Sequence, residues 1–165
     1  MYKRQVENDI RFTEGLNMGE DMMVMMKLFI CAGKVGIVHR PFYHYRQSNP
    51  ESLTKIYSQE HIIQVANNVY EVEKYVNASA YADSLIEFIP FLKLNIKLPL
   101  LITDDKSHYE QWLECFPEAN CYVMNNKLLP LRTRIIQWMA VKRYFILLRL
   151  YYRTVFKLVY GIIYK

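Results

Sequence analysis

The sequence is short of cysteine, and its three cysteines form no familiar motif. Cys31, Cys115 and Cys121 show no Cys-x-x-Cys spacing, and any disulfide scheme leaves one thiol unpaired. This favours a reducing compartment and buried apolar thiols over a disulfide framework or a zinc site. No N-terminal signal peptide is recognisable, because charged and polar residues interrupt the stretch from Met1 to Phe12.

Acidic residues are absent from the last part of the chain. After Glu118 there is no Asp or Glu, whereas nine Lys and Arg residues lie between Lys127 and Lys165. The rest of the chain carries 12 of the 21 basic residues and all 16 acids, a balance of −4. A basic tail on an acidic body predicts an anionic partner for the tail, either a membrane surface or a nucleic acid.

The composition is that of a folded protein, since 52% of the 165 residues are apolar and 15% are aromatic. Strand-like runs at 10–12, 35–39 and 42–46 enclose a helix at 19–32 that is apolar almost all round and is therefore expected to be buried. From about residue 58 the apolar residues recur at helical spacing. We therefore predict three regions: residues 1–57 as mixed α/β, 58–126 as helical, and 127–165 as a basic amphipathic helical tail.

Two helix starts are indicated by local signals. Thr103, Asp104 and Asp105 are typical of the cap of a short helix that runs to Cys115. Pro130 suits the first turn of a last long helix, or of two helices in series.

Residues 10–21 read IRFTEGLNMGED, and with the segments that follow them to residue 55 they resemble the second half of the catalytic domain of family 2 glycosyltransferases. In that family a strand with a Phe and a Glu-Gly turn leads to a Glu-Asp pair that begins a buried helix. A strand like residues 34–38 follows, then residues 40–46, which read RPFYHYR, and then a loop that ends at residues 52–54, SLT. The order and spacing of these pieces carry the resemblance.

The resemblance implies a mixed α/β fold with part of a GT-A sheet edge, and an inverting transfer of sugar from a nucleotide-activated donor to an acceptor hydroxyl. Family members also have an N-terminal half with a nucleotide-binding βαβ arrangement and an Asp-x-Asp metal motif, which this sequence lacks. We expect the chain to be a fragment, a truncated product or half of a split enzyme. No cofactor is expected in this chain, and Mg²⁺ or Mn²⁺ is expected only with the missing half.

Asp21 is the candidate catalytic residue, because an inverting transferase needs a carboxylate that takes the proton of the acceptor hydroxyl. The resemblance assigns that role to Asp21, with Glu20 holding the neighbouring geometry. The alternative is that both acids only favour the helix start, where the helix dipole stabilises a carboxylate by about 0.3–1 kcal/mol.

Candidate donor-side residues follow in the next matched segment. Arg46 suits a diphosphate leaving group because its planar guanidinium binds phosphate oxygens in a bidentate way. His44 shares a strand face with Arg46, and Ser52 lies in the loop that the resemblance places over the donor. The alternative is an ordinary solvated strand edge. His39, His61 and His108 show no metal-ligand spacing with His44, so no metal site is predicted.

The tail favours binding to an anionic membrane surface. In one continuous helix the basic residues Lys142, Arg149, Arg153 and Lys157 fall within an arc of roughly 80°, with apolar residues over much of the remainder. A bilayer-spanning position costs each basic residue about 2.5–3.5 kcal/mol, whereas an in-plane position avoids that cost. Packing of the tail on its own domain or on a partner is the alternative.

These observations predict a glycosyltransferase of cell-surface glycan synthesis, peripheral to the cytoplasmic face of the membrane, with a glycan or lipid-linked acceptor. The alternative function is a non-catalytic helical module that binds a membrane or a partner chain. Nucleic acid is disfavoured, because the aromatic residues of the tail are mixed with long aliphatic ones and do not form a stacking platform.

Overall fold

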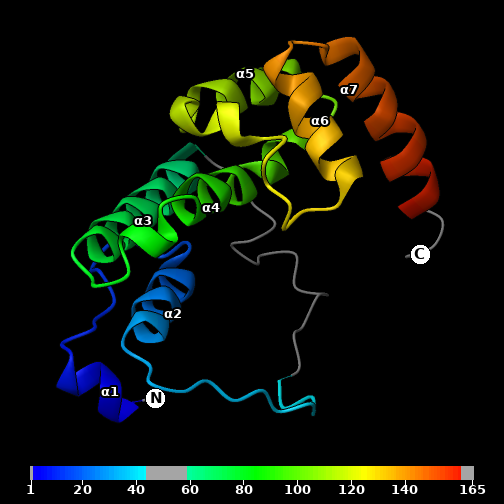
Figure 1. Cartoon of the computed structure of the whole chain (residues 1–165). Coiled ribbons are helices and arrows are strands. Elements are labelled where there is room, and N and C mark those ends of the chain that lie inside the picture. Colours follow the sequence, from blue (N-terminus) through cyan, green and yellow to red (C-terminus); the bar gives the residue numbers. More distant parts are fainter. Residues whose placement is uncertain (1, 44–58, 161–165) are drawn as a thin grey trace. The chain divides into compact units, whose positions relative to one another are not determined.

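The computed structural model describes residues 2–43 and 59–160, and all regular secondary structure within them is helical (Figure 1). The chain divides into two compact units, residues 1–84 and 85–165, and each is described here by itself. The elements, in chain order, are α1 (Tyr2–Glu7), α2 (Glu20–Ile30), α3 (Gln59–Asn77), η1 (Asp83–Leu85), α4 (Phe88–Ile96), η2 (Leu98–Leu101), α5 (Lys106–Glu114), η3 (Pro117–Tyr122), α6 (Leu131–Val141), α7 (Phe145–Tyr151) and η4 (Tyr152–Tyr160). The segments η1 to η3 are 3₁₀-helices, and η4 is a π-helix.

The predicted mixed α/β fold with a GT-A sheet edge is wrong, because the described residues contain no β-strand. Residues 10–12 and 35–39 lie in irregular backbone, and of the third predicted strand only residues 42–43 are described. The run 35–39 has the composition of a strand, but Val35, Ile37 and Val38 are 61%, 79% and 67% exposed. A lone extended segment has no neighbour for its N–H and C=O groups, so β-propensity alone does not make a strand.

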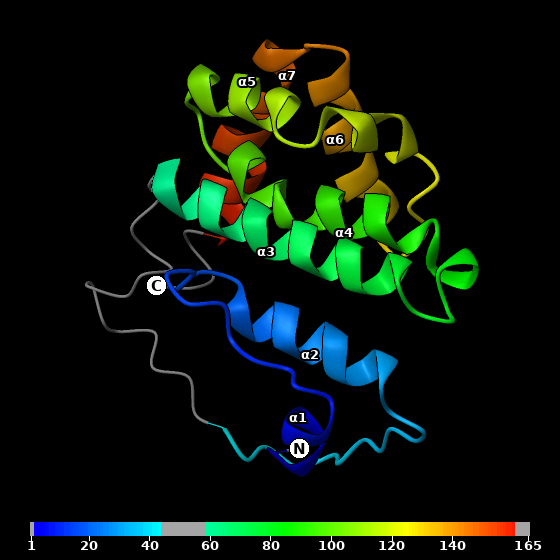
Figure 2. The same cartoon turned by 90° about the vertical axis from the view of Figure 1, so that its left-hand side faces the viewer.

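The first unit is organised by the packing of α2 on α3, which Figure 2 shows side by side. Met23, Val24 and Leu28 are buried on one side of α2. On α3 the buried apolar residues are Val69, Val72 and Val76, a spacing that puts them on one helical face. The predicted start of α2 at the Glu-Asp pair is confirmed, and the helix ends at Ile30. The prediction that this apolar helix is buried holds for only one side of α2, because Phe29 is 47% exposed.

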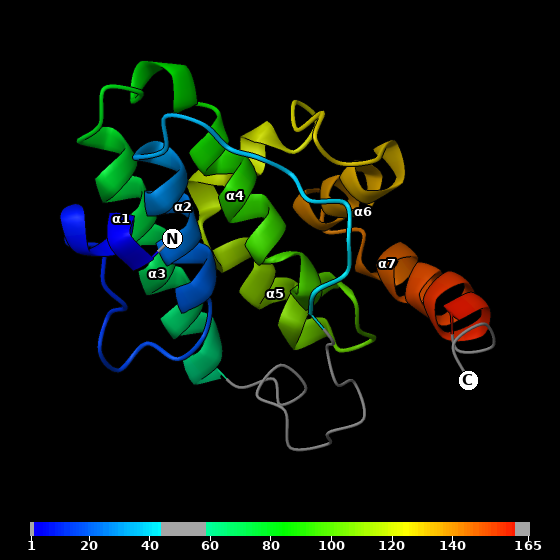
Figure 3. The same cartoon turned by 90° about the horizontal axis from the view of Figure 1, so that it is seen from below.

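The second unit is built from the elements after η1, around the fully buried side chains of Tyr109 and Trp112. The predicted helix cap is confirmed: the Asp105 side chain accepts a hydrogen bond of 2.9 Å from the backbone N–H of Ser107 at the start of α5. Pro130 directly precedes α6. The tail then forms two helical segments in series after α6, and Figure 3 shows α7 following α6 across a short turn.

The predicted regions, 1–57, 58–126 and 127–165, have other boundaries than the two compact units. The boundary predicted at residues 57–58 lies outside the described residues, and the two compact units meet at residues 84–85. All three cysteines are free thiols. The prediction of buried thiols is wrong for Cys121, which is exposed, while Cys31 and Cys115 are half-buried.

Candidate functional site

The candidate catalytic pair lies in the first turn of α2. Gly19 precedes it with φ of 79°, a left-handed conformation that favours glycine. A Cβ atom at this position would lie 3.6 Å from Val65 Cγ2 of α3, so the turn also packs closely on that helix. The Asp21 side chain is exposed, and its Oδ1 accepts a hydrogen bond of 2.7 Å from the N–H of Met22. The Glu20 side chain is half-buried.

Two side chains of α3 hold the loop that leads into this turn. Asn68 Nδ2 donates a hydrogen bond of 2.8 Å to the carbonyl oxygen of Met18, and Gln64 Oε1 accepts one of 3.0 Å from the N–H of Asn17. Asn68 is completely buried, and its bond to the loop is partly buried. Sequence reasoning missed this pair, although polar residues four apart beside the apolar row of α3 were a signal that could have found them.

The donor-side candidates His44, Arg46 and Ser52 all lie outside the described residues, and their assignment stays a prediction. His39 is exposed and His61 is half-buried. Within residues 2–43 and 59–160, the acidic, histidine and cysteine side chains form no group of three or more that would hold a metal ion.

The basic residues of the tail do not belong to one helix, so their predicted alignment is wrong in part. Lys142 is exposed at the end of α6, and Arg143 with φ of 58° breaks the helix there. Arg149 on α7 and Arg153 on η4 are also exposed. The backbone of Lys157 belongs to η4, but its side chain is not among the described ones.

One arginine of the tail is paired with a carboxylate of its own unit, and a second affects the pKa of another. Arg153 Nη2 lies 3.4 Å from Asp104 Oδ2, with the two side chains 59% and 45% exposed. The hydrogen bonds from Ser107 chiefly lower the pKa of Asp105, and Arg149 adds to this lowering. The packing of the tail on its own domain, one of the alternatives above, is therefore present at these positions.

Part of the tail nevertheless leaves apolar side chains uncovered. On α7 the side chain of Leu148 is buried, while Ile146, Leu147 and Leu150 are 85%, 49% and 57% exposed. Their positions put them on one side of the helix, with Arg149 beside them. The exposed side of α7 therefore combines aliphatic and basic groups.

A second exposed apolar row lies on α6. Leu131, Ile135 and Trp138 are exposed and spaced four and three residues apart, so they share one helical face. Tyr144, which is also exposed, meets Trp138 edge-on with ring centroids 5.8 Å apart. We call these four side chains, together with Ile146, Leu147 and Leu150, the apolar face. The sequence analysis predicted membrane contact for the segment from Lys142 onward and did not consider the exposed apolar row of α6.

The most deeply placed charge of the second unit is Lys97, which is only 2% exposed. Its Nζ donates hydrogen bonds of 3.1, 2.7 and 3.3 Å to the carbonyl oxygens of Trp112, Cys115 and Phe116. A fourth, of 2.5 Å, goes to Asn120 Oδ1, and the indole ring of Trp112 lies 4.1 Å away. Burial lowers the pKa of Lys97 to about 8. These bonds satisfy carbonyls at the end of α5, which is a structural role.

Comparison of the chain with family models, with curated proteins and with solved structures found no match. The resemblance to family 2 glycosyltransferases therefore stays a prediction from the order of the motifs. Among the described residues, no helix combines the length and the apolar character needed to cross a bilayer.

Proposed function

We propose that the chain is part of a membrane-associated glycosyltransferase, in which the first unit supplies the acceptor-side carboxylate and the second unit binds an anionic membrane surface. The observation that carries the first part is the Glu20-Asp21 turn. It occupies its place in the motif order and starts a helix. The preceding loop is fixed to α3 through Asn68 and Gln64.

Asp21 has the accessibility that the proposed reaction requires. Its carboxylate is exposed, so an acceptor hydroxyl can approach it and transfer its proton as the oxygen attacks the anomeric carbon. The hydrogen bonds that Asn68 and Gln64 of α3 make with the preceding loop keep this turn in place. This matters because general base catalysis needs the base within hydrogen-bond reach of the hydroxyl.

The test is sugar transfer by an enzyme reconstituted from this chain and a donor-binding half. Replacing Asp21 with Asn should lower turnover by about 10²-fold or more, with little change in donor affinity. Asp83→Asn, another exposed acid of the same unit, is the charge-matched control. Near-normal turnover of Asp21→Asn would reduce Asp21 to a helix-start acid. Calorimetry should show no micromolar binding of nucleotide-sugars to the chain alone.

The second part of the proposal rests on the apolar face and on the lack of acids after Glu118. Moving one large aliphatic side chain out of water contributes about 1.5–3 kcal/mol. Each basic residue near an anionic bilayer adds about 1 kcal/mol. The exposed leucines and isoleucines therefore dominate the expected affinity, and the basic residues select anionic lipid. A helical module that only binds a membrane is the alternative that this observation also supports.

The ion pair between Arg153 and Asp104 gives a sharp test of the membrane contact. An exposed pair contributes about 0.2–1 kcal/mol, comparable to the gain of one arginine at the membrane, so Asp104 competes with the lipid. Asp104→Asn should increase sedimentation with anionic liposomes, and Arg149→Glu with Arg153→Glu should decrease it. Glu114→Gln, at the far end of α5, also removes one negative charge and should increase the sedimentation less than Asp104→Asn does. Equal binding to neutral and anionic liposomes would contradict the proposal.

A further inference from the structure

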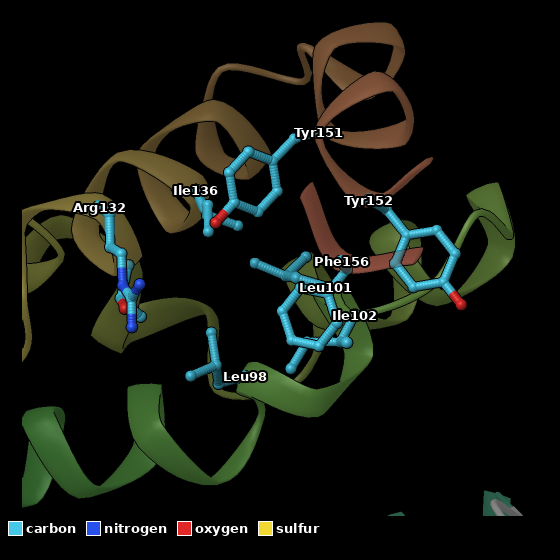
Figure 4. Close-up of a pocket in the computed structure, with 9 residues that line it drawn as sticks. Leu98, Leu101, Ile102, Arg132, Ile136, Tyr151, Tyr152 and Phe156 are labelled. Carbon is cyan, nitrogen blue, oxygen red and sulfur yellow. The ribbon is translucent and has the colours of Figure 1, made fainter. Parts of the chain in front are cut away.

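The second unit contains a pocket of about 170 Å³ between η2, α6 and the helical segment that follows (Figure 4). Leu98 and Leu101 of η2 form one wall, and Ile136 of α6 forms another. Tyr151 and Phe156 close it from the C-terminal side. Its lining is thus mainly aliphatic and aromatic, so the interior suits an apolar group.

The volume limits what this pocket takes. Cavities of about 150 Å³ hold one benzene ring, and pockets for drug-sized ligands measure about 300–1,000 Å³. A space of about 170 Å³ is therefore too small for a nucleotide-sugar. It matches a single ring or a short piece of hydrocarbon chain.

Arg132 supplies a charge at the edge of this pocket. It lines the pocket from α6 and is exposed, and Figure 4 shows its guanidinium at one end, apart from the aromatic side chains. Around the axis of α6, Arg132 lies about 40° from Ile136, which forms a wall of the pocket. It lies about 100° in the other direction from Leu131 of the apolar face. It therefore stands between the pocket and the surface proposed to meet the membrane.

The wall opposite α6 has an unusual backbone. Tyr152 and Phe156 belong to the π-helix η4, and their rings stack with centroids 6.2 Å apart. π-Helices are rare, and only their single-turn form inside α-helices is known to recur at functional sites. Here η4 contributes two aromatic rings to the lining of the pocket.

We propose that the pocket binds part of an acyl chain of an anionic phospholipid, with the phosphate held by Arg132. A guanidinium binds two phosphate oxygens at once, which suits a headgroup at the pocket edge. The inference extends the membrane-binding part of the proposed function. Because the pocket lies within one unit, it can be tested with soluble lipid, without any membrane.

The experiment is a calorimetric titration of the full chain with dihexanoyl phosphatidylglycerol below its micelle concentration. The phosphatidylcholine of the same chain length and inorganic phosphate are titrated in parallel. We expect the anionic lipid to bind, the neutral lipid to bind at least about tenfold more weakly, and phosphate alone not to bind. Equal binding of both lipids would overturn the role of Arg132, and binding of phosphate alone would overturn the role of the apolar pocket.

Variants separate the pocket from the surface. Arg132→Gln should weaken the anionic lipid about tenfold and leave the neutral lipid unchanged, whereas Lys127→Gln, at an exposed lysine of the same unit, should change neither. Ile136→Trp should fill the pocket and abolish binding of both lipids, and Leu98→Trp does the same from another wall if the first variant does not fold. Wild-type affinity in a folded variant of this kind would overturn the proposal. Loss of liposome binding with unchanged soluble-lipid binding would instead count only against the membrane surface.

Discussion

Replacement of Lys97 with Met tests the most deeply buried charge described in the second unit. The Lys97 ammonium has four oxygen acceptors, the carbonyls of Trp112, Cys115 and Phe116 and the side chain of Asn120. It has nevertheless lost almost all its water, since the residue is 2% exposed. Met has a similar length and no titrating group. The variant therefore removes the proton equilibrium while it keeps most of the apolar stem.

The sign of the pH effect follows from the two pKa values. Burial lowers the pKa of Lys97 from 10.5 to about 8 in the folded state. Between these values the unfolded chain binds more protons than the folded one, so the free energy of unfolding rises with pH. One pKa unit corresponds to about 1.4 kcal/mol. Between pH 7.5 and 9.5 the wild type should therefore gain about 2 kcal/mol relative to Lys97→Met.

Tryptophan fluorescence during urea denaturation is the assay. The chain has two tryptophans, Trp112 and Trp138, and both belong to the second unit, so the signal reports on that unit. Burial raises the pKa of Cys115 and Lys97 lowers it, so both proteins are compared with Cys115→Ser in the background. Lys106→Met, an exposed lysine of α5, is the control and should follow the wild type. Parallel pH curves for wild type and Lys97→Met would mean that the four oxygens keep the ammonium charged, against the reasoning above.

Two further predictions concern single hydrogen bonds. Asp105→Ala should lower the urea midpoint at pH 7, and the difference should disappear as the pH falls through the lowered pKa of Asp105, because only the ionised carboxylate caps α5 effectively. Asn68→Ala should leave the Met18 carbonyl without its buried donor and destabilise the first unit by about 1–3 kcal/mol. In Asn68→Ala we expect faster hydrogen exchange at the Asn17 amide and no change in α5. Unchanged exchange at Asn17 would mean that Asn68 does not hold this loop.

The helices of this chain follow from signals that are local in the sequence. The start of α2 at Glu20 needs only a glycine and two acids in the first turn. The cap of α5 at Asp105 needs one side chain and an N–H two residues later. Such interactions are complete within a few residues, so a sequence pattern contains everything that determines them.

The predicted strands failed for the opposite reason. A strand is stabilised by a neighbour that is distant in the sequence, and residues 35–39 have none among the described residues. Their exposed Val35, Ile37 and Val38 show that β-branched composition alone did not determine the backbone. The site residues divide in the same way. Asp21 was predicted from its motif, whereas Asn68 acts across 50 positions of sequence, and its spacing from Gln64 does not show which loop the two residues hold.

Lys97 shows a further limit of sequence reasoning. Lysine is among the residues least often buried, and nothing beside Lys97 in the sequence marks it as an exception. Its burial depends on the end of α5 and on the turn into η3, where three carbonyls and Asn120 converge. The residue becomes recognisable only when two segments 15 to 23 positions apart are brought together.

The tail shows how one local break changes a functional interpretation. A continuous helix would align Lys142 with Arg149 and Arg153, and their joint charge would then act at one membrane-facing edge. The left-handed Arg143 ends α6, so Lys142 is placed by α6 and the two arginines by the segments that follow. Arg153 then meets Asp104 at 3.4 Å, and the attraction left for lipid is reduced by that carboxylate. Exposed apolar rows lie on both α6 and α7, so apolar side chains remain available although the charges are not aligned. Since burial of aliphatic surface contributes more per side chain than an exposed charge does, membrane affinity in this chain should depend more on the apolar face than on its arginines.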